Sequence, residues 1–471
     1  MKEVSINKIF ELGIALSAEK DDAKLFGSIL NEAIDLTQSD AGTIYILSDG
    51  KLNFNYMITR SKGIDQSADR GEITIPPVPM YRSHVCACCA MDKNLINIKD
   101  VYEDDEYDFS GAQKYDVLND YRTKSMLVVP MLDETDDCIG VLQLINANKD
   151  GETICYDAED ENIIRTLASF AAVSLNNRLM SAAINDLLHS FVTVMVGAID
   201  IRSPYNANHT KSMVNYGEKF LSWTSNNDCD FKIKDKDRDP FLMSIWLHDI
   251  GKLLIPLEVM DKATRLGDDA KDVLHRISIA ILMEKLSGNE EKIETIKNAR
   301  DFIMSINEAG FLPDEKLEQL NEIAKLHILD EDGNDIPLLT DEEIKALSIR
   351  KGTLTDDERN IIESHVEYTN KMLSGMKFTG RYKNVTEVAS SHHEFINGTG
   401  YPKHKSAEDI SDETRLLTIL DIYDALTAED RPYKPPMPVE KAFAILYDMA
   451  DEGKLDKHIL DLFKESHAWE K

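Results

Sequence analysis

The sequence has little of several features that would assign a protein to a class directly. Six cysteines in 471 residues do not resemble a disulfide framework. No apolar run approaches the roughly 18 residues that span a bilayer. The first residues, MKEVSINKIFELG, lack the charged-then-apolar pattern of a secretion signal. We therefore expect a soluble, cytoplasmic protein that has no membrane partner.

Positive charge is also scarce. The chain has 53 Lys and Arg against 85 Asp and Glu, a formal net charge of -32. Proteins that bind long nucleic acids draw mostly on Lys and Arg contacts to phosphate, so we do not expect such a partner. A small phosphorylated ligand stays open, because it needs only a local positive site, which bound metal ions can supply.

The length predicts two or three domains, and 42% hydrophobic residues are enough for real cores. Apolar spacing predicts a helix over residues 22–37, and an Asp-Gly turn at residues 49–50 between alternating runs predicts a hairpin. Strand patterns follow at 125–131 and 138–147, and a long helix begins near residue 157. After about residue 190 almost every pattern is helical. The fold class is therefore multidomain, with an α+β domain (an antiparallel sheet with flanking helices) before an all-α domain.

Three of the six cysteines lie close together, at Cys86, Cys88 and Cys89. We favour packing in a cytosolic core over a metal or redox role, because a free cysteine behaves as a small buried hydrophobe.

Two motifs carry the chemistry: HDIGK, beginning at His248, and HHEFINGTGYP, beginning at His392. Imidazole next to carboxylate suits divalent iron, manganese or zinc. Asp239 and Pro240 mark the start of the helix before HDIGK, and Gly251 marks its end. Glu394 is interpreted as a partner that orients a ligand histidine.

Further histidines and carboxylates complete a set. His209 and His365 lie in helical contexts, and Asp421 and Asp424 are three residues apart on one helix face. Two metals about 3.5–4 Å apart need a bridging carboxylate and several imidazoles. Each histidine alone is weak evidence for a ligand, but the pattern as a whole predicts a metal-dependent phosphohydrolase.

The N-terminal part resembles a GAF sensor domain over roughly residues 3–178. The resemblance rests on AGTIYIL at Ala41, LINIKD at Leu95, and YRTKSMLVVPM with IGVLQLINA from Tyr121. YRTKSM is most similar to the GAF domains of cyclic-nucleotide phosphodiesterases. The resemblance implies either a small ligand, such as a cyclic nucleotide, over the sheet or a role in dimerisation, and both stay open.

The second part resembles the HD-GYP family of metal phosphohydrolases, whose motifs HDxGK and HHExxxGxGYP stand here as HDIGK and HHEFINGTGYP. The resemblance implies hydrolysis of cyclic di-GMP to linear pGpG, and onward to GMP in some members, with two divalent ions, iron or manganese, per chain. Lys252 and Asp424 would join Asp249 as catalytic residues, and Lys252 would also contact substrate with Gly400, Tyr401, Arg431 and Lys434. The implied metal ligands are His209, His248, Asp249, His365, His392, His393 and Asp421.

Three positions depart from the family pattern. Members with three metals carry Glu where this chain has Tyr205, so we expect two metals. Asn397 replaces an Asp of the turn, and a long insertion separates the two histidine motifs. Two alternatives stay open: hydrolysis of another cyclic dinucleotide or nucleotide phosphoester, and a metal-binding cyclic-dinucleotide receptor with little turnover.

We expect a GAF-like sensor domain at residues 1–178, a connecting helix at 179–196, and an HD-GYP domain at 197–471 with a helical insertion at about 267–350. A continuous helix between a sensor and an output domain often dimerises, and we expect a homodimer.

Overall fold

The computed structural model of the protein describes residues 21–202, 208–330, 332–428 and 436–470. Two compact units are present, residues up to 186 and residues from 187. One helix, α5 (Ala158–Arg202), has residues in both units.

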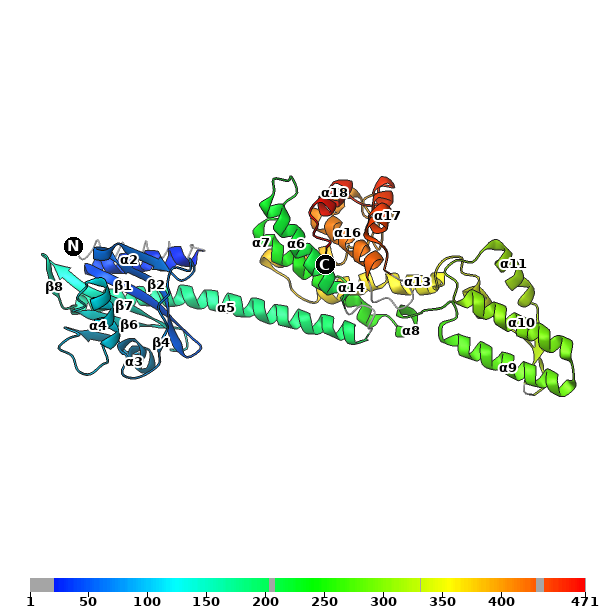
Figure 1. The fold of residues 1–471 in the computed structure, drawn as a ribbon, viewed down its shortest axis with the longest axis horizontal. Helices are drawn as coiled ribbons and strands as arrows, with labels where there is room; N and C mark the ends of the chain where they lie inside the picture. Colours follow the sequence, from blue (N-terminus) through cyan, green and yellow to red (C-terminus); the bar gives the residue numbers. More distant parts are fainter. Residues whose placement is uncertain (1–20, 203–207, 331, 429–435, 471) are drawn as a thin grey trace. The chain divides into compact units, whose positions relative to one another are not determined.

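The first unit is built on one antiparallel sheet, in the order β3-β2-β1-β7-β6-β5 (Figure 1). The predicted hairpin turn lies at Asp49 and Gly50, which both have positive φ angles. The short strands β4 and β8 pair with β2 and β7. The strand bounds are β1 (Ser39–Ser48), β2 (Lys51–Thr59), β3 (Ile64–Ser67), β4 (Val78–Pro79), β5 (Ile96–Ile98), β6 (Met126–Leu132), β7 (Cys138–Lys149) and β8 (Glu152–Ile154).

Helices cover both faces of this sheet. One face packs against α2 (Asp22–Thr37) and the first part of α5, where residues such as Ile29 and Leu167 are fully buried. The other face packs against α3 (Val85–Asp92), with α4 (Ser110–Asn119) nearby (Figure 1). Because successive strand residues point to opposite faces, Leu142 and Leu144 enter the first core and Val141 enters the second. The predicted α+β class of this domain is confirmed.

All three cysteines of the cluster are buried on α3, and Cys86 and Cys89 lie inside the second of these cores. Burial raises the pKa of the Cys86 thiol to about 12, and it also raises the pKa of Cys89. Thiols with such raised pKa values stay protonated and unreactive at neutral pH, in agreement with a packing role.

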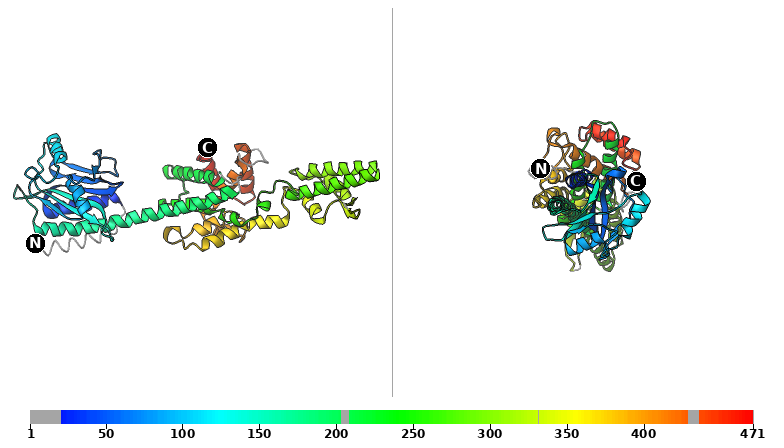
Figure 2. Two further views of the ribbon diagram at one scale, coloured as in Figure 1. Left: turned by 90° about the horizontal axis from the view of Figure 1, so that it is seen from below. Right: turned by 90° about the vertical axis from the view of Figure 1, so that its left-hand side faces the viewer.

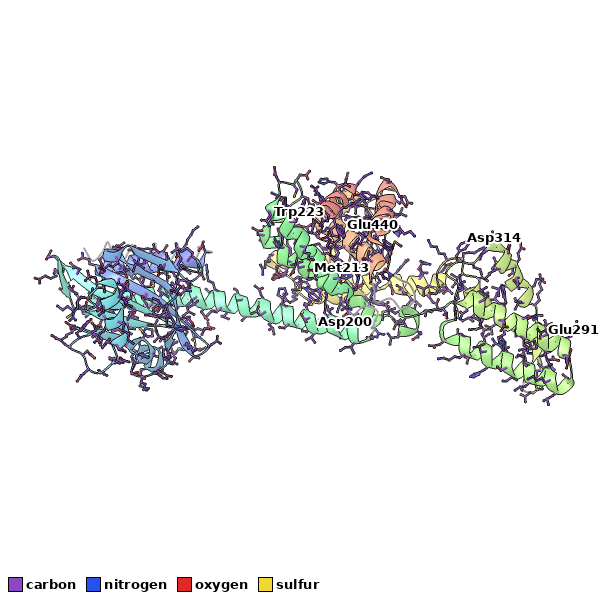
Figure 3. All side chains as sticks on the ribbon, in the orientation of Figure 1. Asp200, Met213, Trp223, Glu291, Asp314 and Glu440 are labelled. Atoms are coloured by element: carbon purple, nitrogen blue, oxygen red, sulfur yellow. The ribbon has the colours of Figure 1, made fainter. Side chains whose placement is uncertain are left out.

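The second unit is mostly helical, as predicted. Its largest core joins α6 to α16, α17 and α18 and contains Met213, Phe220, Tyr423 and Phe463; Met213 is labelled in Figure 3. The helix bounds are α6 (His209–Asn226), α7 (Asp235–Leu247), α8 (Leu257–Met260), α13 (Asp356–Glu363), α14 (His365–Ser374), α15 (Val385–Ala389), α16 (Asp412–Thr427), α17 (Val439–Asp451) and α18 (Lys457–Glu465).

The segment expected as a helical insertion has a hydrophobic core of its own, formed by residues between Leu266 and Leu347. It contains α9 (Ala270–Ser287), α10 (Glu290–Asn307), α11 (Asp314–Ile323) and α12 (Asp341–Leu347), and α9 and α10 run side by side (Figure 2). It also contains two paired strands, β9 (His327–Leu329) and β10 (Asp335–Pro337), which the sequence analysis did not predict. The acidic turn between them is ordered by Asp330, whose carboxylate accepts the N–H groups of Asp332 and Asn334.

A buried arginine joins the two ends of this segment. Arg265 is fully buried, and its guanidinium donates to the carbonyl groups of Ile306, Ala309 and Ile349. Ile306 lies in the last turn of α10, Ala309 lies just after this helix, and Ile349 lies just before the chain leaves the segment. One side chain therefore holds the entry and the exit together.

The helix that leads to HDIGK differs from the prediction at both ends. α7 begins at Asp235, so Pro240 lies inside it, and it ends at Leu247, before the motif. Gly251 does not end this helix; it belongs to the 3-10 helix η3 (Ile250–Leu254). A Cβ atom there would lie 1.9 Å from the His365 carbonyl oxygen, so this glycine is required by a close approach to α14.

Among the described helices, α5 is long and apolar enough to cross a membrane by length and composition alone. The sequence analysis, which looked for uninterrupted apolar runs, did not single it out.

Candidate metal centre

Asp249 lies between two groups of histidines, and each of its carboxylate oxygens faces one of them. Oδ2 is 3.1 Å from His248 Nε2 and 3.7 Å from His209 Nε2. Oδ1 is 3.4 Å from His365 Nε2 and 3.9 Å from His392 Nε2. This arrangement allows one carboxylate to bridge two cations.

The first group is rich in carboxylate. His209 Nε2 lies 3.3 Å from His248 Nε2 and 3.2 Å from Asp421 Oδ1. These residues come from the start of α6, the loop after α7 and the middle of α16. All three are buried, and one ligand atom of each lies within 4.8 Å of the others.

The second group contains three histidines. His365 at the start of α14 faces His392 and His393 in the loop after α15, again with ligand atoms within 4.8 Å of one another. His393 also reaches toward the first group, because its Nδ1 lies 3.8 Å from Asp421 Oδ2. The structure thus brings together all seven residues that were predicted as metal ligands.

Backbone carbonyl groups fix the tautomer of three of these histidines. Nδ1 of His248, His365 and His392 lies 2.6–2.7 Å from the carbonyl oxygen three residues earlier in the chain. A carbonyl oxygen can only accept, so Nδ1 carries the proton. Nε2 of each ring therefore presents a lone pair to the centre.

This tautomer fits a bound cation. With their Nδ1 atoms protonated, His365 and His392 point two Nε2 lone pairs at each other across 3.4 Å. Burial lowers the pKa of His365 to about 4 and lowers that of His392 well below its usual value. Neither ring therefore carries a second proton that could form a hydrogen bond between the two Nε2 atoms at neutral pH. A divalent cation that accepts both lone pairs matches this donor set.

The charge distribution differs between the two groups. Burial lowers the pKa of His209, but hydrogen bonds to Asp421 and Asp424 outweigh it and raise this pKa to about 9. Burial raises the pKa of Asp249, and the neighbouring His248 and Lys252 overcome this and hold it well below the usual range. The centre therefore carries ionised, buried carboxylates that favour a cation.

Two predicted catalytic residues contact ligands of the centre. Lys252 Nζ lies 2.6 Å from Asp249 Oδ2, and its side chain is 21% exposed, so it lies at the edge of the centre. Asp424 Oδ2 lies 2.7 Å from His209 Nδ1, while Nε2 of the same ring faces the first group. Asp424 thus holds His209 by the nitrogen that faces away from Asp421.

The loop after His393 is shaped by Glu394 and Gly400. The buried Glu394 carboxylate accepts the backbone N–H groups of Lys403 and Lys405, so it orders this loop and does not orient a histidine as interpreted from the sequence. A Cβ atom at Gly400 would lie 2.3–2.5 Å from the backbone of residues 393–395. This close approach places the Tyr401 ring 4.8 Å from the His393 ring.

Arg431, Lys434 and Tyr205 lie outside the described residues.

One residue of the site had no signal in the sequence. Thr369, fully buried on α14, donates its hydroxyl to the carbonyl of His248 and accepts the N–H of Gly251. This pair of hydrogen bonds fixes HDIGK against α14.

The first unit contains a cavity of about 400 Å³ over the sheet, on the side of α3 and α4. Its wall is largely apolar, with residues such as Phe54, Val85 and Phe109. Tyr115 also lines the cavity, and its hydroxyl oxygen, which is buried, has no hydrogen-bond partner among the described residues.

The YRTKSM segment borders this cavity, but its polar groups are used within the protein. The Tyr121 hydroxyl donates to Asp40 at 2.7 Å, and the Thr123 hydroxyl donates to Asp116 at 2.8 Å. The segment therefore forms part of the cavity wall, and the hydrogen atoms of these two hydroxyls are already donated to carboxylates of the protein.

The fold and the centre define an α+β domain and a helical domain with a cluster of histidines and carboxylates that could hold metal ions. Residues 23–175 match the GAF domain family, and residues 340–459 match the HD domain family. The chain therefore contains a GAF domain and an HD domain. The HD match includes His365, His392, His393 and Asp421, whereas the structure adds the earlier motif HDIGK to the same centre.

Curated relatives are similar over short stretches. The chain is 39% identical over 101 residues to 3′3′-cGAMP-specific phosphodiesterase 3 of Vibrio cholerae serotype O1. The aligned stretch covers 21% of this chain and 21% of that protein. It is 36% identical over 122 residues to the cyclic di-GMP phosphodiesterase response regulator RpfG of Xanthomonas campestris pv. campestris, which covers 26% of this chain and 31% of that protein. The chain thus spans less than a third of the length of these two relatives.

Among solved structures, the GAF domain of an Acinetobacter phosphoenolpyruvate-protein phosphotransferase is similar over 38% of this chain and 98% of its own length. The sequence identity is 11%, and the TM-score is 0.30.

Gly251→Ala should disrupt the centre, because its Cβ atom would lie 1.9 Å from the His365 carbonyl oxygen and 2.6 Å from Thr369 N. We expect a loss of on the order of 3 kcal/mol or more in the free energy of unfolding, together with loss of metal binding. Calorimetry and metal analysis of the purified variant measure both. Gly310→Ala, which meets nothing within 4 Å, is the matched control. Equal stability and metal content in the two variants would contradict the close approach.

Asp424→Ala should weaken metal binding by ~10–100-fold, because it removes the partner that orients His209. Asp424→Asn keeps an acceptor oxygen for Nδ1 and should lose less. Competition with a chelator measures the affinity. Asp412→Ala, an exposed change on the same helix, is the control and should bind metal like the unaltered protein. An unchanged affinity in Asp424→Ala would mean that His209 needs no such partner.

Proposed function

We propose that the chain is a metal-dependent phosphodiesterase that hydrolyses cyclic di-GMP to linear pGpG, the product that some family members convert onward to GMP. The observation that carries this proposal is the shared carboxylate of Asp249, with histidine groups on both sides. The similarity to proteins named as cyclic di-GMP and cGAMP phosphodiesterases supports the substrate class.

The proposed metal ligands are His209, His248 and Asp421 for one ion and His365, His392 and His393 for the other, with Asp249 shared. When bound, two iron or manganese ions supply Lewis acidity at the phosphodiester and activate water. The carboxylate-rich first group and the histidine-rich second group give two unlike sites, in agreement with borderline metals in place of calcium or magnesium.

The chain's own residues would bind and orient the substrate around this centre. Lys252 holds its ammonium group at Asp249 Oδ2 and is exposed on one side, so it can contact a phosphate oxygen with a charge-assisted hydrogen bond. Gly400 and Tyr401 form one wall by closing the loop over His393. We extend the substrate contacts to Arg431 and Lys434 on the family resemblance alone.

We propose a division into a GAF sensor domain at residues 1–178, a connecting helix at 179–196, and an HD-GYP domain at 197–471 with the insertion at about 267–350. The GAF domain would regulate hydrolysis by binding a small ligand, such as a cyclic nucleotide, in its cavity. The cavity of about 400 Å³, with its largely apolar wall, supports a ligand there.

Asp249→Ala should abolish both metal content and hydrolysis, because it removes the ligand that both groups share. The measurement is metal analysis of protein purified without oxygen, together with product formation from cyclic di-GMP on the same sample. Asp235→Ala, an exposed carboxylate at the start of α7, is the control and should keep both. Full turnover in Asp249→Ala would sink the proposed centre.

The same samples separate the alternatives. Metal-loaded protein that hydrolyses another cyclic dinucleotide, such as 3′3′-cGAMP, faster than cyclic di-GMP would change the substrate and keep the enzyme. Metal-loaded protein that binds a cyclic dinucleotide and hydrolyses none would identify a receptor.

Tyr115→Phe should have opposite effects on stability and on binding in the GAF domain. Removing a buried hydroxyl without a partner should leave the melting temperature unchanged or raise it, whereas affinity for cyclic GMP or cyclic AMP should fall by about tenfold. Thermal shift and calorimetric titration measure the two effects. Tyr102→Phe, which removes a hydroxyl bonded to Asp116, should lower the melting temperature and leave the affinity unchanged. If neither nucleotide shifts the melting temperature of the unaltered protein, the cyclic-nucleotide proposal fails.

A further inference from the structure

Helix α5 exposes apolar side chains at a regular interval of seven residues. Five of these side chains follow one another at this spacing, and each has nearly half or more of its surface exposed: Val173 (60%), Met180 (48%), Leu187 (71%), Val194 (72%) and Ile201 (87%). Two more exposed side chains lie three residues before members of this series: Ile184 (62%) before Leu187, and Phe191 (50%) before Val194. Seven of the eight large hydrophobic side chains exposed on the described helix therefore fall on two positions of a heptad, the eighth being Leu179.

This spacing is that of a coiled-coil seam. With Val173 and its repeats at position d, position a is occupied by Asn177, Ile184, Phe191 and Ala198, and all four side chains are exposed. A straight helix drifts by about 20° per heptad against a repeat of seven, so the stripe stays in contact only with a partner helix that supercoils around it. A stripe directed at a globular core would follow a repeat of 3.6 residues.

The buried residues of α5 occupy the opposite face of the helix. In its first half, Ala168, Ala171 and Leu175 are buried in the core of the first unit, at positions f, b and f. In its second half, Val192 and Val196 are buried in a core of the second unit, at positions b and f. Positions b and f lie opposite a and d. The packing inside each unit therefore leaves the seam uncovered.

The residues that border the seam are small or uncharged. Positions e and g between Val173 and Ile201 are occupied by Ser174, Asn176, Ser181, Ala183, Leu188, Ser190, Met195 and Gly197. The only Lys, Arg, Asp or Glu residues in this segment are Arg178, Asp186 and Asp200, at positions b and c; Asp200 is labelled in Figure 3. Two identical helices can therefore approach without like charges facing each other across the seam.

We propose that residues 173–201 of α5 form a parallel two-stranded coiled coil with the same segment of a second copy of this chain. Identical heptads match when two copies lie in parallel and in register, because each seam residue then meets its own counterpart. Asn177 supports this orientation. A polar asparagine at one a position prefers to face another asparagine, and only parallel, in-register pairing provides it.

The first test compares two doubly substituted full-length chains with equal added charge. Ile184→Glu with Leu187→Glu places charge on the seam, whereas Ala182→Glu with Thr193→Glu places it on exposed positions f and c. Sedimentation equilibrium should give twice the chain mass of 53.2 kDa for the unaltered protein and for the control, and the single mass for the seam variant. Circular dichroism well below the melting temperature should show the same helix content for both variants, so that unfolding does not account for the lower mass of the seam variant.

The second test measures orientation. Cys155 is exposed, so it is first replaced by serine. In that background, Asn177→Cys should form an intermolecular disulfide under mild oxidation, because parallel pairing brings the two residues face to face. Asn185→Cys, at position b, should not.

Three outcomes would overturn the proposal. The first is a monomeric unaltered protein. The second is a dimer that the seam variant keeps or that the control loses equally, which would assign the contact to another surface. The third is sedimentation of the unaltered protein with phosphatidylcholine vesicles that the seam variant does not show, which would assign the apolar stripe to a membrane.

Discussion

The Asp249 carboxylate lies between two groups of histidines, and the packing around it depends on this position. Its two oxygens face elements that are distant in sequence, the end of α7, the start of α14 and the loop after α15. The close contact between Gly251 and α14 holds the motif in place, together with Thr369, which forms hydrogen bonds to both His248 and Gly251.

The orientation of the histidines follows from helix termini. His248 comes directly after α7, His365 comes two residues after α13 ends, and His392 comes three residues after α15 ends. The last carbonyl groups of a helix have no partner within it. In each case Nδ1–H donates to one of them, so a single hydrogen bond caps a helix and turns Nε2 toward the centre.

The sequence predicted these residues because their chemical types and spacing are local features. With the family resemblance it predicted the seven residues that the structure brings together, and it predicted the hairpin at Asp49 and the helical class of the second domain. It could not predict the partners of Thr369, Glu394 and Asp424, because the orientation of a buried side chain depends on the element packed against it. Gly251 was assigned to a helix end for the same reason: a glycine that permits close packing and one that ends a helix look alike in sequence.

The segment between the two histidine motifs, which has its own core, is bounded by residues that contact each other next to the centre. Lys262, before the insertion, binds the Glu358 carboxylate after it at 2.7 Å, and the Lys262 side chain is almost buried. Glu358 also completes the capping box that begins α13 with Thr355, and α13 leads directly to His365. The free-energy cost of closing a loop rises only slowly with its length. The path from HDIGK to His365 is therefore set by this ion pair and cap, and the segment between them can carry its own core and surface without moving the ligands.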